Sequence, residues 1–338
     1  MNFTEKLQTA YTRIKLAKRV LLVGHVSPDA DALASISAMA EIADGFGAEV
    51  SAYAGQKPDN YYDFIPRNNL VSTAEPVDLK VFDLILILDC GSIARTGLEK
   101  RLRALIKAEQ DGHIARRPYL MEFDHHEPSE TYADLEIRLS NKASTTEIIY
   151  NFLKVNGLEI SKTLAHCILI GLMTDTGHFL HANASREAMA IASEMLLRGA
   201  SLPKIVNNTV HNKSFSSLKI WGRALENLCL NEDTGLAVSA LTSAEIKTLL
   251  SPGNAELDAD LFGDIVSFLS SLSGVRVALF LREENDRVKG SLRTNDEKID
   301  VAKIAQKWGG GGHKKAAGFS LAGRLQKTDT GWKVINNV

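Results

Sequence analysis

Four short and almost continuously apolar runs alternate with helical patterns up to about residue 200. The runs are RVLLVG (19–24), EVSAYA (49–54), FDLILILD (82–89) and YLMEFD (119–124). The helical patterns lie at 5–18, 31–44, 97–109, 143–156, 161–174 and 185–198. Strands that are apolar on both faces and separated by helices are typical of a parallel sheet covered by helices on both sides. The sequence therefore predicts an α/β N-terminal domain with a parallel sheet and helices on both faces.

The second half of the chain has a different pattern. GLAVSAL, VRVALFLRE and RVKGSLR alternate like strands, and helical patterns lie near 243–250, 261–272 and 299–307. The stretch between the halves contains Gly, Pro and consecutive Asn without a clear period, which favours a linker. Two domains of about 150 residues each are the simplest expectation for a chain of 338 residues. We expect a parallel-sheet domain at 1–197, a linker at 198–214 and a smaller α+β domain at 215–338.

The composition fits a globular protein, with 45% hydrophobic and 24% charged residues. The apolar runs at 84–88 and 168–173 are far shorter than the ~20 residues that a membrane span needs. The N-terminus has no apolar signal core, and Cys90, Cys167 and Cys229 have no CxxC spacing. We therefore expect a cytoplasmic protein with reduced cysteines that does not bind a membrane.

The charge is spread unevenly along the chain. A net charge of −2 argues against a protein that binds long nucleic acid by bulk electrostatics. Between Arg276 and Lys327, however, twelve Lys or Arg residues face six Asp or Glu residues. This local excess suits a small anionic ligand held between the basic C-terminal region and the acidic N-terminal one. A basic face that is simply solvated is the alternative interpretation.

Acidic and histidine side chains follow the apolar runs at four places. They are His25, Asp29 and Asp31 in LLVGHVSPDAD, Asp89 in LILILDCG, Asp124, His125 and His126 in YLMEFDHH, and Asp175 in HCILIGLMTDTGHF. The carboxyl ends of strands in an open α/β sheet line one crevice, so we expect these side chains at a common edge. Asp175 follows an apolar helix, and the dipole at a helix C-terminus disfavours negative charge. This position therefore indicates a nearby cation.

Five carboxylates in one pocket would keep several protons unless positive charge compensates them. Two divalent cations would provide most of that charge. Carboxylate and imidazole ligands together favour Mn²⁺ or a similar ion over a thiolate-type structural zinc site. Two ions roughly 3.5–4 Å apart can activate a water and clamp a phosphoryl group for displacement. Each motif alone has a simpler interpretation, since an Asp at a strand end often caps a helix.

The motifs HVSPDADALAS, LDCG, FDHH and TDTG resemble, in order, the four signatures of the DHH phosphoesterase superfamily. GSLRTN and WGGGGHKKAAG resemble its DHH-associated domain. The length and the glycine-histidine end are most similar to the nanoRNase / pAp phosphatase (oligoribonuclease) group. The resemblance implies an Mn-dependent phosphoesterase of the exoribonuclease or bisphosphate nucleotidase type. Its substrates would be short oligonucleotides, 3′-phosphoadenosine 5′-phosphate (pAp), or both, cleaved by a water that two metals activate.

The resemblance also implies roles for individual residues. One cation would be held by His25, Asp29 and Asp89, and the other by Asp31, Asp89, His125 and Asp175. The two divalent cations would be Mn²⁺, with Mg²⁺ or Co²⁺ as alternatives. Asp124 would fix an imidazole, as carboxylates near metal sites commonly do, and His126 would face the substrate phosphate. Asp89, Asp124 and His126 would thus take part in catalysis.

The C-terminal region offers candidate substrate contacts. Glycines let backbone N–H groups approach an anion closely, so Gly310, Gly311 and Gly312 could form a phosphate nest, to which His313 adds a donor. A flexible loop is the plainer interpretation of the glycine run. Arg293 could bind a phosphate with two hydrogen bonds.

Weaker substrate candidates are Ser291, in the GSLRTN motif, and Arg95. Many relatives have an arginine near Phe179, where this chain has His178 and His181. That difference either removes a phosphate contact or makes it pH-dependent.

Two other functions stay open. A cyclic di-AMP or linear dinucleotide (pApA) phosphodiesterase is the rival within the same class. A nucleotide-binding regulator without catalysis is the rival from another class, although the intact set of ligands argues against it. We expect a short oligonucleotide or nucleotide as the partner, with no long nucleic acid, and the sequence is compatible with a monomer or a homodimer.

Overall fold

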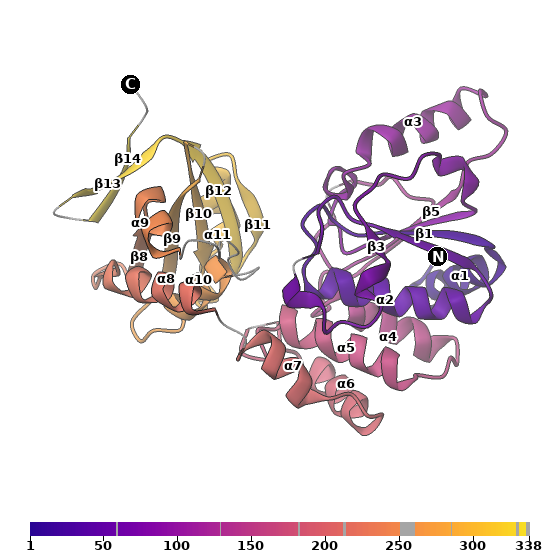
Figure 1. The fold of residues 1–338 in the computed structure, drawn as a ribbon, viewed down its shortest axis with the longest axis horizontal. Coiled ribbons are helices and arrows are strands. Elements are labelled where there is room, and N and C mark those ends of the chain that lie inside the picture. The colour runs from indigo at the N-terminus through magenta and orange to yellow at the C-terminus, as the bar shows by residue number, and fades with distance from the viewer. Residues whose placement is uncertain are drawn as a thin grey trace. The chain divides into compact units, whose positions relative to one another are not determined.

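The computed structural model describes residues 1–58, 60–128, 130–181, 183–211, 214–250, 261–284, 286–328 and 331–335. Its contacts divide the chain into two compact units, Met1–Asn212 and Lys213–Val338 (Figure 1). The division falls inside the stretch at 198–214 that the sequence favours as a linker. Each unit has its own sheet and its own buried apolar clusters.

Unit 1 is built on a six-stranded sheet in which each pair of neighbouring strands is parallel. The strands are β1 (Arg19–Val23), β2 (Glu49–Tyr53), β3 (Val71–Ser72), β4 (Leu84–Leu88), β5 (Tyr119–Asp124) and β6 (Leu135–Arg138), in the order β3-β2-β1-β4-β5-β6. The four strands predicted from apolar runs are confirmed. The short β3 and β6 were not predicted, because two and four residues give no clear period. The chain leaves β1 toward β2 and then returns to β4, so the direction of winding switches between β1 and β4.

Helices cover both faces of this sheet. They are α1 (Phe3–Leu16), α2 (Ala30–Gly45), α3 (Glu99–Gln110), α4 (Thr145–Val155), α5 (Lys162–Asp175), α6 (Arg186–Leu197) and α7 (Leu202–Thr209), with 3₁₀ turns at Asn60–Tyr62, Asn68–Leu70, Leu79–Val81 and Ile93–Thr96. Val20 and Leu22 of β1 join a cluster with α1, α2, α4 and α5, whereas Leu21 and Val23 join a cluster with α3. The predicted α/β architecture is confirmed.

Helix α7 lies inside the stretch interpreted from the sequence as a linker. Its start is specified by Ser201, whose side chain accepts a hydrogen bond from the Lys204 N–H, and by Pro203 in the first turn. Ile205 is fully buried in the core of unit 1. Leu202, Ile205 and Val206 have the i, i+3, i+4 spacing of an apolar helix face, but the neighbouring Gly, Pro and consecutive Asn residues favour the linker interpretation.

Unit 2 contains a six-stranded mixed sheet in the order β11-β12-β10-β9-β8-β7. The strands are β7 (Cys229–Asn231), β8 (Leu236–Leu241), β9 (Val277–Glu284), β10 (Arg287–Arg293), β11 (Gly311–His313) and β12 (Ala316–Ala322), and β13 (Arg324–Thr328) pairs with β14 (Gly331–Ile335). The helices are α8 (Phe215–Glu226), α9 (Ser243–Leu249), α10 (Leu261–Ser270) and α11 (Val301–Gln306). Strands β8 and β9 are parallel, and the other neighbouring pairs are antiparallel. The expected α+β domain is confirmed, and no helix in the described part of the chain is long and apolar enough to span a bilayer.

Candidate metal centre

The strand edge beside the winding switch gathers the acidic side chains. Ligand atoms of His25, Asp29 and Asp89 all lie within 4.8 Å of one another, and we call these residues the first ligand group. Ligand atoms of Asp31, His125 and Asp175 also lie within 4.8 Å of one another, and they form the second ligand group. The structure thus brings together the six residues proposed as metal ligands. Their binding of metal stays a prediction.

Asp89 links the two groups. Its Oδ1 lies 3.4 Å from Nε2 of His125, whose Nε2 is also 3.1 Å from Oδ2 of Asp175. The Asp89 backbone has φ of 60°, in the left-handed region that few non-glycine residues adopt, and Gly91 follows with φ of 70°. This tight turn directly after β4 keeps Asp89 at the strand edge. Such a backbone conformation is common where function constrains a residue.

The position of Asp31 depends on residues far away in the sequence. Its two carboxylate oxygens accept hydrogen bonds from the N–H groups of Thr145 (2.6 Å) and Thr146 (3.2 Å), at the start of α4. A Cβ on Gly171 of α5 would overlap Oδ1 of Asp31 and Oγ1 of Thr146. Glycine at this point therefore gives the buried carboxylate its space. Nδ2 of Asn183 donates to the backbone carbonyl of Asp175 over 3.1 Å and so ties the end of α5.

No sequence motif singles out the four supporting residues, Thr145, Thr146, Gly171 and Asn183. A signal existed for the first two, because Ser144 and Glu147 have the spacing of a capping box at a helix start. It marks where α4 begins but does not reveal which carboxylate the helix meets.

Asp124 holds the ring of His126. Oδ1 of Asp124 lies 2.7 Å from Nδ1 of His126 and accepts the His126 backbone N–H over 2.8 Å, while its Oδ2 accepts the N–H of Gly91. Burial opposes ionisation of Asp124, but the hydrogen bond and charge of His126 outweigh it and lower its pKa to about 2. On the far side of the ring, Nη1 of Arg95 lies 3.4 Å from Nε2 of His126. Arg95 and His126 thus lie together beside the ligand groups.

The second ligand group is electrostatically crowded. Burial, and then the charge of Asp175, raises the pKa of Asp31 to about 8. Burial, followed by the charge of Asp31, raises the pKa of Asp89 well above its usual range. Burial lowers the pKa of His125, but its hydrogen bond with Asp175 outweighs this and the pKa rises. In the protein alone, these carboxylates are therefore stabilised by protons, and cations could replace those protons.

The first ligand group offers a clearer test of whether a metal fits. Nε2 of His25 is buried and has no hydrogen-bond partner among the described residues, and it lies 3.6 Å from Oδ2 of Asp29. Desolvation opposes ionisation of Asp29, yet the neighbouring His25 imidazole lowers its pKa. A buried imidazole nitrogen beside two carboxylates is a suitable donor set for a divalent cation. The residues present therefore fit the expected metal pair.

The candidate substrate residues of unit 2 share one region of its sheet. Arg293 of β10 and His313 of β11 both pair with Ala316 of the strand between them, and directly opposed residues project to the same face. Two residues further along the strands, Ser291 pairs with Gly318, which pairs with Gly311 on the other side.

The glycine run itself has a structural explanation. A Cβ on Gly310 would overlap the carbonyl of Gly318, and a Cβ on Gly312, with φ of 136°, would meet the carbonyl of Ala316 at 2.5 Å. Close pairing of β11 with β12 therefore requires these two glycines. Anion binding by the run stays a prediction.

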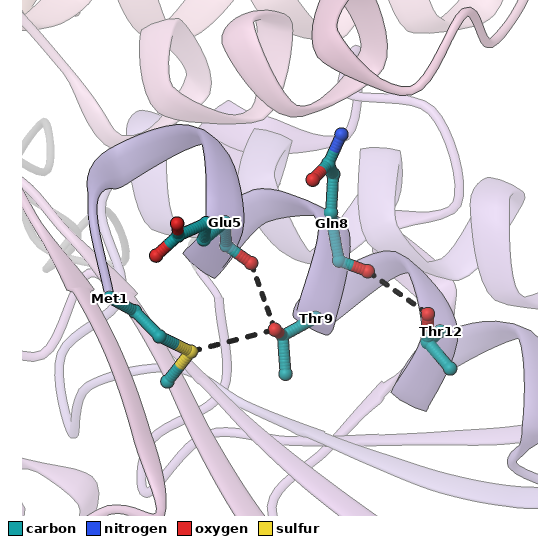
Figure 2. A pocket seen from close by; sticks show the side chains of 5 residues that line it. All are labelled: Met1, Glu5, Gln8, Thr9 and Thr12. Carbon is teal, nitrogen blue, oxygen red and sulfur yellow. Dashed lines mark hydrogen bonds between the residues drawn. The ribbon is translucent and has the colours of Figure 1, made fainter.

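Two surface hollows of unit 1 lie elsewhere. One of about 390 Å³ runs along α1 and is lined by Met1, Glu5, Gln8, Thr9 and Thr12 (Figure 2). The hydroxyls of Thr9 and Thr12 bond to carbonyls of the helix itself, and Glu5 is used in the capping box of α1. The other, of about 300 Å³, is lined by Phe179, Met189, Ala192, Ser193 and Leu196. Neither contains a member of the two ligand groups.

Comparisons with known proteins agree with this geometry. The model of the DHH family, N-terminal domain, matches residues 19–172, and that of the DHHA1 domain matches residues 234–337. The bifunctional oligoribonuclease and PAP phosphatase NrnA of Thermus thermophilus is 27% identical over 323 residues, covering 95% of this chain and 90% of that protein. The protein of the same name from Bacillus subtilis is 26% identical and covers 94% and 93%. The crystal structure of an exopolyphosphatase-related protein from Bacteroides fragilis superposes with a TM-score of 0.80, at 25% identity, covering 93% of this chain and 90% of that one.

Proposed function

We propose, from the premise that this chain belongs to the DHH family and ends in a DHHA1 domain, that it hydrolyses short oligonucleotides and pAp. The relatives named as oligoribonucleases and PAP phosphatases support a phosphoesterase that acts on nucleotides or oligonucleotides. The observation that most supports the chemistry is Asp89, a buried carboxylate of the first ligand group at the winding switch whose Oδ1 lies 3.4 Å from Nε2 of His125 in the second group. An open α/β sheet binds its ligands at such a switch.

We assign His25, Asp29 and Asp89 to one divalent cation, and Asp31, Asp89, His125 and Asp175 to a second. Mn²⁺ is the proposed ion, with Mg²⁺ and Co²⁺ as alternatives. When bound, the cations supply a water of lowered pKa and positive charge for the phosphoryl oxygens. This charge also removes the electrostatic cost of placing Asp31 and Asp89 together.

The residues beside the metals bind and orient the substrate in this proposal. Asp124 fixes the ring of His126 with the proton on Nδ1, and so turns Nε2 toward Arg95. A phosphate oxygen of the substrate would then accept hydrogen bonds from the Arg95 guanidinium and, once Nε2 is also protonated, from the His126 ring. In unit 2, we assign Arg293, Ser291, His313 and the glycines 310–312 to substrate binding as well. Substitution of Arg293 by Ala would raise KM more than it lowers kcat.

A substrate panel tests the proposal. Di-adenylate, pAp, pApA and cyclic di-AMP would be incubated with Mn²⁺, Mg²⁺, Co²⁺ or a chelator, and the products separated by chromatography. We expect turnover of di-adenylate and pAp with Mn²⁺ and none with chelator. Fast turnover of cyclic di-AMP or pApA alone would instead favour the dinucleotide phosphodiesterase. Tight nucleotide binding without hydrolysis in any metal would favour the regulator.

The cellular setting is part of the same proposal. The free thiols of Cys90, Cys167 and Cys229 are compatible with the reducing cytoplasm that the sequence analysis expects. Short substrates would need no extended basic surface, in keeping with the net charge of −2.

A further inference from the structure

The first turn of α4 contacts both ligand groups. The backbone N–H of Thr145 donates to Oδ2 of Asp31 over 2.6 Å, and the Thr145 hydroxyl donates to Oδ1 of Asp89 over 2.9 Å. Thr145, Asp31 and Asp89 are buried to within 1% of full burial. One residue therefore bonds to a carboxylate of the second ligand group and to the carboxylate that links the two groups.

The backbone half of this contact follows from how α4 begins. The first N–H groups of a helix have no partner inside the helix, and they form a positive end that favours anions. Ser144 caps α4 with a bond from the Glu147 N–H, and Asp31 takes the N–H groups of Thr145 and Thr146. Asp31 thereby acts as an anchor between α2, to which it belongs, and α4.

The second contact, the hydrogen bond from the Thr145 hydroxyl to Asp89, depends on how the threonine side chain is held. Thr145 is β-branched, which restricts its χ1 rotation, and its backbone is already held by Asp31. Its Oγ1 is therefore presented to Asp89 in one position. Because Asp89 must direct oxygens toward two cations, a fixed donor on Oδ1 limits how its carboxylate can rotate.

We propose that Thr145 is a positioning residue that sets the carboxylate of Asp89 for both metal sites and couples their occupancy through Asp31. The inference rests on the proposed function, because it assumes that the ligand groups bind cations. It goes beyond that function by assigning a role to a residue that is neither a metal ligand nor a substrate contact.

The test compares the removal of the hydroxyl with its retention. Thr145→Val keeps the shape of the side chain and removes the donor, whereas Thr145→Ser keeps the donor. Thr209→Val is the matched control, because Thr209 is a buried threonine of α7 whose hydroxyl bonds to the Ile205 carbonyl. Mn²⁺ binding to chelator-treated protein is measured by calorimetry, and kcat and KM are measured with the best substrate of the panel.

We expect Thr145→Val to weaken Mn²⁺ binding by about 10- to 100-fold, the usual effect of losing a bond to a metal ligand. Thr145→Ser, which keeps the donor but not the β-branch, should lose less affinity for Mn²⁺ than Thr145→Val, and Thr209→Val should bind Mn²⁺ like the unchanged protein. The proposal is wrong if Thr145→Val binds Mn²⁺ normally, or if Thr145→Ser loses as much affinity as Thr145→Val. Should Thr145→Val not fold, Thr145→Ala removes the same hydroxyl and is judged by the same criteria.

The unchanged protein separates this inference from the proposed function. If it binds Mn²⁺ and hydrolyses the panel while Thr145→Val is normal, only the role of Thr145 fails. If it binds no Mn²⁺, both fail. If it binds Mn²⁺ without hydrolysis and Thr145→Val still weakens binding, the positioning role stands and the hydrolase proposal falls.

Discussion

The two ligand groups differ in how they carry their charge. In the first group, Asp29 is half exposed at the start of α2, and its pKa is lowered by the neighbouring His25 despite the opposing effect of burial. In the second group, Asp31 is fully buried, and its pKa is raised to about 8, first by burial and then by Asp175. Asp29 of the first group therefore stays ionised without a cation, whereas Asp31 of the second retains a proton. The two halves of one centre should respond differently to substitution, metal removal and pH.

The largest effect is expected from a substitution of Asp89, the residue that links the two groups. Asp89→Asn removes the carboxylate that we assign to both cations, so we expect kcat/KM to fall by about 1000-fold or more, as with other groups that act in the transition state. The fold should persist, because the pKa of Asp89 is raised and a neutral side chain resembles its metal-free state. Circular dichroism melting in chelator checks the fold. Asp111→Asn, at an exposed site after α3, is the control and should keep normal activity. Near-normal activity of Asp89→Asn would refute the role of Asp89 in both cation sites.

A substitution on α5 should damage the second group in particular. Gly171→Ala would place a methyl group against the Asp31 carboxylate and the Thr146 hydroxyl. We expect a loss of about 1–3 kcal/mol in the free energy of unfolding, typical of overpacking, together with weaker Mn²⁺ binding. Urea unfolding and calorimetry measure the two effects.

Gly45→Ala is the matched control for this substitution, since a Cβ there meets nothing within 4 Å. Equal behaviour of the two variants would mean that the packing around Asp31 is not tight.

The first group can be weakened with little change in stability. Asp29→Asn keeps an acceptor for the Ala32 N–H, and Asn caps helices about as well as Asp does. We expect the free energy of unfolding in chelator to fall by no more than about 1 kcal/mol, because the half-exposed Asp29 loses only a solvent-screened pairing with His25. Titration with Mn²⁺ should show one weakened site and one retained site. Equal weakening of both sites would show that the groups do not act as separate halves.

The same contrast explains what could be predicted from the sequence. The apolar runs before His25, Asp89 and Asp124 mark strand ends, and parallel strands place their ends together, so the meeting of these residues follows from local patterns. The contact of Asp31 with Thr145 joins residues 114 positions apart, and no local pattern records it. Gly171 looks like an ordinary helix residue until the carboxylate beside it is located. Supporting residues of a buried centre are therefore the part that sequence patterns do not reveal.

The smallest effect is the dependence of stability on pH. Asp31, Asp89 and His125 all have raised pKa values, so the folded protein binds more protons than the unfolded chain at pH values between their unfolded and folded pKa values. Stability from these groups is thus present at low pH and lost as the pH rises through the folded pKa. Asp29 has a lowered pKa and contributes nothing to the change between about pH 6 and pH 9, because it is ionised in both states there.

In chelator, the free energy of unfolding of unit 1 should therefore fall from about pH 6 to pH 8, where Asp31 loses its proton, and Asp31→Asn should make this fall shallower while Asp29→Asn leaves it unchanged. Saturating Mn²⁺ should reverse the trend, because cations bind more tightly once the ligands have lost their protons. Urea unfolding at several pH values, followed by the fluorescence of tyrosines, measures the slope. A flat profile for the unchanged protein in chelator would mean that the second group holds no extra proton, and the two halves would then carry their charge alike.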